Sequence, residues 1–151
     1  LEYNGKKYAQ SLAIDLYLAR KFNLMGKDIE EDYQIHNLFC CIEDISVPIW
    51  KFAFCQDKEK VEEFKKVAKE KYIFYIKKIE ERYIANGKGK YFLGDKFTLA
   101  DIFIGACLPS FCDSFGECIV PQVAPTLTEL VKRIMENELK EFHEKVFIKS
   151  H

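Results

Sequence analysis

The sequence has no uninterrupted apolar stretch that would cross a lipid bilayer. The longest such run, residues 102–108, ends at Pro109, whereas a membrane-spanning helix needs about 20 apolar residues. No basic segment followed by an apolar one opens the chain, so nothing in it indicates secretion. Lysine plus arginine (23) almost balance aspartate plus glutamate (24). Without a basic patch, we expect neither a nucleic-acid partner nor a membrane partner.

Paired cysteine motifs are also missing. None of the six cysteines belongs to a Cys-x-x-Cys pair, and their neighbours are mostly apolar. Free cysteines in such surroundings behave as small buried hydrophobic residues, and this spacing does not indicate a metal site. We therefore expect reduced, buried thiols in a cytoplasmic protein, with neither a disulfide nor a zinc site. The six are Cys40, Cys41, Cys55, Cys107, Cys112 and Cys118.

What is present is enough apolar material for a packed core. Hydrophobic residues make up 48% of the 151 positions, and a chain of this length buries about 70% of its unfolded surface. Asn4-Gly5 between two strand-like segments predicts a tight hairpin at the start. A two-stranded hairpin is not stable alone. The chain is therefore expected to be a fragment whose upstream part, the rest of a sheet, is missing.

After the hairpin, apolar residues recur at three- and four-residue spacing, which predicts helices. Ser11 is a candidate N-cap for a first helix over residues 12–22. Asp28 with Glu31 has the spacing of a capping box, and Asp57 opens a third helix. Both of these later helices are long and amphipathic, and the outer side of the third is dense in lysine and glutamate.

The clearest helix start is Thr98 followed by Asp101. In a capping box the threonine hydroxyl accepts from the amide three residues on, while the carboxylate accepts from the threonine amide. Residues 102–108 are apolar on nearly every side, so this helix is expected to run through the core. Taken alone, the box indicates fold rather than function. Thr126 with Glu129 predicts one more box further along.

Four motifs follow one another along the chain. They are L-E-x-x-G-K-x-x-x-Q-S-x-A-I-x-x-Y-L-A at residues 1–19, L-M-G-K at 24–27, F-L-G-D-x-x-T-x-A-D at 92–101 and A-P-x-L at 124–127. In this order they resemble the end of the thioredoxin-like domain, the interdomain linker, the capping-box motif and the closing helices of cytosolic glutathione transferases. The first motif most resembles the sigma class of that superfamily.

The resemblance implies a mainly α fold in two parts. Residues 1–26 are expected to be the C-terminal part of a thioredoxin-like α/β domain, a β-hairpin plus one helix, with the linker. Residues 27–151 are expected to form the all-helical C-terminal domain of a glutathione transferase. Most of the N-terminal domain is expected to be missing.

The resemblance also implies a site for glutathione, as a co-substrate and not as a cofactor. Ser11 resembles the serine that binds the γ-glutamyl carboxylate, and free amides and the positive end of a helix dipole gather at such a position. Gln10 offers one acceptor and two donors to the same group. Asp44 corresponds to the acid that reaches the ligand's α-ammonium in the neighbouring subunit, which implies a homodimer. The alternatives are that Ser11 is an ordinary N-cap serine, that Gln10 is a solvated loop amide and that Asp44 is a plain exposed acid.

The second substrate would be a small hydrophobic electrophile. Trp50 and Phe54 lie four residues apart on the long helix, and we expect them to line an apolar pocket on which a flat electrophile stacks. Core packing is the alternative for both. His36 and His143 have no nucleophile at a recognisable spacing, so they are interpreted as structural.

The reaction that the resemblance implies is attack of the glutathione thiolate on the electrophile. A free thiol has a pKa of about 8.5, so the protein must favour the anion with a hydrogen-bond donor. In the sigma class that donor is a tyrosine on the first strand, ahead of the region that matches Leu1. No catalytic residue is therefore assigned in these 151 residues, which are expected to be inactive alone. The alternative is a non-catalytic, transferase-like structural or interaction protein, although such a protein need not retain Gln10, Ser11 and Asp44.

Overall fold

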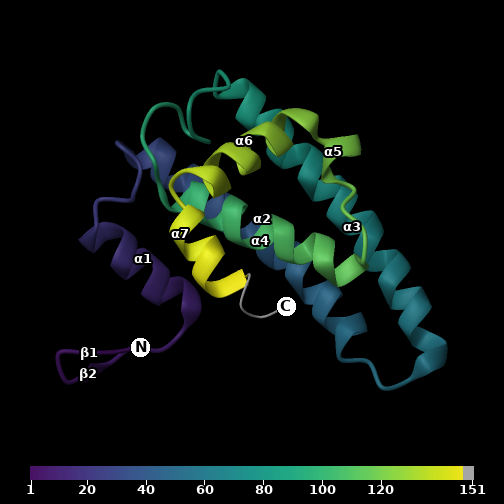
Figure 1. Cartoon of the computed structure of the whole chain (residues 1–151). Helices are drawn as coiled ribbons and strands as arrows, with labels where there is room; N and C mark the ends of the chain where they lie inside the picture. Colours follow the sequence, from purple (N-terminus) through teal and green to yellow (C-terminus); the bar gives the residue numbers. More distant parts are fainter. Residues whose placement is uncertain (148–151) are drawn as a thin grey trace.

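The computed structural model describes residues 1–147, and side chains up to residue 145. It shows a helical bundle with a small hairpin to one side (Figure 1). The elements in chain order are β1 (Glu2–Tyr3), β2 (Lys6–Lys7), α1 (Ser11–Lys21), α2 (Ile29–Ala53), α3 (Lys58–Ala85), α4 (Leu99–Phe115), α5 (Val120–Val123), α6 (Pro125–Glu136), α7 (Lys140–Phe142) and a π-helical turn, His143–Phe147. The predicted mainly α fold is confirmed.

The hairpin forms at the predicted turn. Asn4 and Gly5 both have positive φ angles, 50° and 71°, as the two central residues of a type I′ turn require. Strands β1 and β2 are antiparallel, with Tyr3 opposite Lys6. Both strands are exposed along their whole length.

The core lies between the two long helices α2 and α3 and the apolar helix α4 (Figure 1). On α2 and α3 the buried residues recur every three or four positions, which confirms the amphipathic pattern read from the sequence. On α4 ten of the seventeen residues are buried, and its buried set is mostly apolar. Fully or almost fully buried side chains on the two long helices are Ile35, Leu38, Ile42, Ile45, Ile49, Ala68, Tyr72, Ile76 and Ile79.

The starts of α2 and α3 agree with the sequence prediction. Asp28 is the N-cap of α2, and its Oδ1 accepts from the Glu31 amide at 2.9 Å. In a capping box the Glu31 carboxylate would accept from the amide of the N-cap residue, Asp28. Here it accepts from the amide of the preceding residue, Lys27, at 2.9 Å. Asp57 is the N-cap of α3 and accepts from the Glu59 amide at 3.1 Å.

The predicted cap of α1 is wrong. Ser11 is the first helical residue and not the N-cap; the N-cap is Gln10, whose carbonyl accepts from the Ile14 amide at 3.0 Å. No side chain among the described residues caps this end of the helix. The hairpin delivers the chain to α1 with a left-handed backbone at Gln10, and this geometry moves the helix start back by one residue.

The box predicted from Thr126 and Glu129 is also wrong. Helix α6 begins at Pro125, where proline suits the first helical position because it has a fixed φ and no amide proton. The first free amide, that of Thr126, donates to Oε1 of Glu80 on α3 at 2.6 Å. A carboxylate from another helix therefore takes the place of the local cap.

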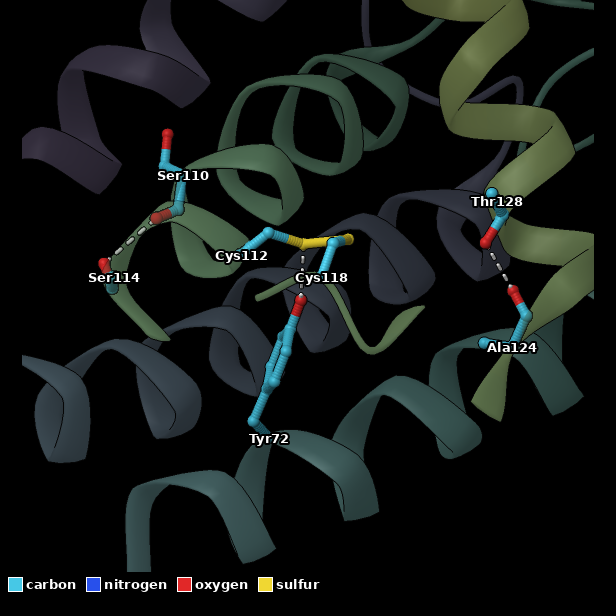
Figure 2. Close-up of a disulfide and its surroundings, with 7 residues drawn as sticks. All are labelled: Tyr72, Ser110, Cys112, Ser114, Cys118, Ala124 and Thr128. Atoms are coloured by element: carbon cyan, nitrogen blue, oxygen red, sulfur yellow. Dashed lines mark hydrogen bonds between the residues drawn. A yellow bond between two sulfur atoms is a disulfide. The ribbon is translucent and has the colours of Figure 1, made fainter. Parts of the chain in front are cut away.

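The cysteines also differ from expectation. Cys112 and Cys118 form a disulfide, with their Cα atoms 4.4 Å apart (Figure 2). They come together because Gly116 ends α4 with a φ of 71°, which turns the chain back onto the last turn of the helix. Cys118 and Cys40 are exposed, so only part of the set is buried as predicted.

Candidate functional site

The residues predicted to bind the γ-glutamyl group lie where the hairpin leads into α1. Gln10 and Ser11 are both exposed. Because no side chain caps α1, the amides of its first turn have no protein acceptor within residues 1–147. These amides and the positive end of the helix dipole together form an environment that stabilises an anion.

The backbone at Gln10 is unusual. Its φ of 69° lies in the left-handed region, which a residue with a Cβ occupies at a cost of about 1–3 kcal/mol. Such conformations concentrate at functional sites. The sequence carried no signal for this conformation, because glycine or asparagine is the usual residue there.

Asp44 is exposed on α2 and has a partner on α3. Its Oδ2 accepts from the Tyr75 hydroxyl at 2.7 Å, and this hydrogen bond raises the pKa of Tyr75. The Tyr75 ring meets Phe74 edge to face, with centroids 5.2 Å apart. No hydrogen bond or ion pair in the described part of the chain joins Asp44 to Gln10 or Ser11. Within these residues the hydrogen-bond partner of Asp44 is Tyr75.

Trp50 and Phe54 lie at the end of α2, and both are exposed. Their exposed fractions are 52% and 81%, so neither ring is packed in the core that the described residues form. Phe54 is the C-cap residue, and its amide donates to the Trp50 carbonyl at 3.0 Å. The two rings extend an exposed apolar strip that includes Val47, at 55% exposure.

The predicted capping box of α4 is present and buried. The Thr98 amide and hydroxyl donate to Oδ2 of Asp101 at 2.9 Å and 3.2 Å. The Phe92 amide donates to the other carboxylate oxygen at 2.8 Å, a contact that the spacing of the box did not predict. Burial raises the pKa of Asp101, and the hydrogen bonds from Phe92 and Thr98 act in the opposite direction. Asp101 thus ties the preceding loop to the helix, which is a structural role.

In the part that the structure describes, no three histidine, cysteine or acidic side chains are grouped to hold a metal ion. His36 is partly buried, and its Nε2 has no partner among these residues. Burial raises the pKa of Cys107 to about 11, with contributions from the carboxylates of Asp15 and Glu43. A thiol with this pKa is almost entirely protonated near neutral pH.

No helix within residues 1–147 has both the length and the apolarity needed to span a bilayer.

Comparison with known proteins places these features in a family context. Residues 43–146 match the family model described as glutathione S-transferase, C-terminal domain. Glutathione S-transferase 2 of Manduca sexta is 41% identical over 107 residues, which cover 70% of this chain and 52% of that relative. The chain therefore spans about half the length of this relative.

Two solved structures are similar over most of the chain. A Pi-class glutathione S-transferase of Onchocerca volvulus has a TM-score of 0.80 and 25% identity, covering 98% of this chain and 70% of that one. A sigma class transferase of Fasciola hepatica has a TM-score of 0.71 and 28% identity, covering 87% of this chain and 63% of that one.

Proposed function

The chain belongs to the glutathione S-transferase family, and we propose that the protein containing it conjugates reduced glutathione to small hydrophobic electrophiles. The observation that most directly supports this proposal is the exposed start of α1, whose first-turn amides have no acceptor among the described residues. The γ-glutamyl carboxylate would accept from these amides and from the Ser11 hydroxyl. The Gln10 side chain would donate to the same group.

The proposal includes a homodimer. Asp44 of each subunit would pair with the α-ammonium of the glutathione bound by the other, as the resemblance to the family implies. Two exposed apolar side chains near Asp44 support a contact between copies: Val47 on α2 and Phe74 on α3, each 55% exposed. A two-fold axis would bury Val47 and Phe74 in both subunits at once and leave Trp50 and Phe54 open.

Catalysis in this proposal depends on residues outside these 151. Residues 1–26 would complete a thioredoxin-like domain, and residues 27–151 would form the helical domain. A tyrosine ahead of Leu1 would stabilise the thiolate, as the resemblance to the sigma class implies. Two similar structures carry different class names, Pi and sigma, so the class rests on the motif at residues 1–19. A cytoplasmic location is part of the same proposal.

The electrophile would bind on the exposed end of α2. Trp50 and Phe54 present flat apolar surfaces there, and both side chains are exposed. Aromatic rings of this kind bind planar electrophiles through offset stacking. Each Trp50→Ala and Phe54→Ala variant should therefore raise the KM for the electrophile more than the KM for glutathione.

The test uses the full-length protein, its retention on immobilised glutathione and its conjugation of a chromogenic aryl halide. Ser11→Ala and Asp44→Asn should each raise the KM for glutathione, because a charge-assisted hydrogen bond contributes about 1.5–3 kcal/mol, roughly ten- to hundredfold. Glu43→Gln, at the neighbouring acid, is the matched control and should leave the KM unchanged. Retention without turnover would favour the non-catalytic alternative. An unchanged KM in both site variants would overturn the site assignment.

A further inference from the structure

A small apolar hollow opens between α4, α5 and α6, and it includes no residue of the proposed glutathione site. Its volume is about 210 Å³, below the roughly 300–1,000 Å³ of pockets that hold drug-sized molecules. Leu108 and Pro109 contribute from α4, Val120 and Pro121 from α5, and Val131 from α6. Three separate helices therefore hold this lining in place. A volume of this size suits a ligand no larger than a single substituted ring.

The inner surface of this hollow has few free polar groups. The hydroxyl of Thr128, which also lines it, already donates to the Ala124 carbonyl at 3.0 Å (Figure 2). The disulfide between Cys112 and Cys118 forms part of the wall, with the Tyr72 hydroxyl 3.6 Å from the Cys112 sulfur. A ligand would therefore meet carbon and sulfur along most of its length.

The lining of the hollow includes one acidic residue, Asp113. An adjoining hollow shares Asp113 and the two disulfide cysteines and adds Glu117, and neither hollow is lined by a lysine or an arginine. Glu117 is already paired with Lys69 at 2.6 Å. The exposed Asp113 carboxylate makes no ion pair with any residue from 1 to 147. Asp113 thus adds one negative charge without an ion-pair partner among residues 1–147 to the lining of an apolar cavity.

We propose that this hollow binds a small molecule with an apolar body and a protonated amine. The apolar body would pack among the side chains of α4, α5 and α6, and the ammonium would lie beside Asp113. The same charge disfavours carboxylate ligands, so the site differs in its chemistry from the anion-binding start of α1. The proposal does not depend on the proposed transferase function.

The experiment is a titration of the isotope-labelled protein, followed by amide NMR shifts, with three probes of similar shape. These are 2-phenylethylamine, 2-phenylethanol and phenylacetate. Saturable shifts are expected at Val120, Thr128 and Val131. The amine should bind up to about fivefold tighter than the alcohol, which is the usual range for an exposed ion pair. Phenylacetate should bind most weakly.

Two variants assign the effect to named groups. Asp113→Asn should remove the amine's advantage and leave the alcohol's affinity unchanged, while Asp95→Asn, at an exposed acid of another loop, should change neither. Val131→Trp should fill the hollow and weaken both probes, with the remaining amide spectrum reporting that the fold is intact. The proposal is overturned if wild-type protein binds the amine and alcohol equally, if Asp113→Asn keeps the amine's advantage, or if excess S-hexylglutathione displaces the amine.

Discussion

The start of α4 and the start of α1 are both marked by short local motifs, but different environments surround them. Thr98 and Asp101 are fully buried, and three hydrogen bonds from protein donors reach the Asp101 carboxylate. Gln10 and Ser11 are exposed, and within residues 1–147 no side chain caps their helix. Along α1 only Ala19 is buried.

From this difference we expect burial to decide how much a helix-start motif contributes to stability. In the core, a polar group that loses its partner has no water to replace it. At the start of α1, water satisfies the same groups, so they remain available to a ligand. The two regions are joined by backbone hydrogen bonds at the linker, where the Leu99 amide donates to the Leu24 carbonyl at 2.8 Å.

The largest expected effect is the loss of the buried carboxylate. Asp101→Ala removes the acceptor of the Phe92 and Thr98 amides, and each buried donor left unpaired costs about 1–3 kcal/mol. The free energy of unfolding should fall by about 2–6 kcal/mol, measured by urea unfolding with circular dichroism. Asp95→Ala, at an exposed acid in the same motif, should change it by less than about 0.5 kcal/mol. Equal losses of stability at the two positions would contradict the expectation that burial makes the Asp101 carboxylate important.

The next effect concerns the carboxylate that caps α6 from another helix. Glu80→Ala leaves the Thr126 amide without its acceptor, and loss of a cap typically costs about 0.5–2 kcal/mol. Glu80→Gln retains an acceptor oxygen and should recover most of that stability. Glu81→Ala is the control, because Glu81 is exposed and pairs with Lys78 on its own helix. If Glu81→Ala destabilises as much as Glu80→Ala, the interhelix cap is not what holds the start of α6.

A smaller effect compares the two helix starts directly. Thr98→Ala should cost about 0.5–2 kcal/mol as the loss of an N-cap. Ser11→Ala should change the free energy of unfolding by less than about 0.5 kcal/mol, because the Ser11 side chain does not cap α1. Both are measured by the same urea unfolding. A cost at Ser11 as large as that at Thr98 would show that a cap forms in solution at α1 as well.

Features set by neighbouring residues were predictable from the sequence. The hairpin turn, the starts of α2, α3 and α4 and the buried stripes follow from turn residues, caps and periodicity, which act over a few positions. The caps of α1 and α6 were predicted wrongly because other residues decide them. At α1 the positive φ of Gln10 moves the start, and at α6 a partner 46 residues away, Glu80, replaces the local cap.

The candidate site was predictable only as a set of residues. Which side chains are exposed at the start of α1 depends on the hairpin geometry, and the partner of Asp44 is Tyr75, 31 residues further along the chain. No sequence motif predicted the disulfide, because the turn at Gly116 is what brings Cys118 back to Cys112. Contacts at such separations leave no periodic pattern in a single sequence.

The last expected effect lies where the two regions meet. The pKa of Cys107 on α4 is raised to about 11. The largest cause is burial, and the carboxylates of Asp15 on α1 and Glu43 on α2 add to it. An unfolded cysteine ionises near pH 8.5, so between these values the native state holds a proton that the unfolded state has released. Stability should therefore fall as pH rises through that range.

Cys107→Ala should flatten this fall, measured as the free energy of unfolding in urea at a series of pH values under argon. Asp15→Asn should flatten it partly, because it removes the contribution that α1 makes to the raised pKa. Cys40→Ala is the control, since Cys40 is exposed and should leave the slope as it is. A slope that Asp15→Asn does not alter would mean that α1 does not reach Cys107 in solution. The N-terminal region would then be held to the bundle by its linker alone.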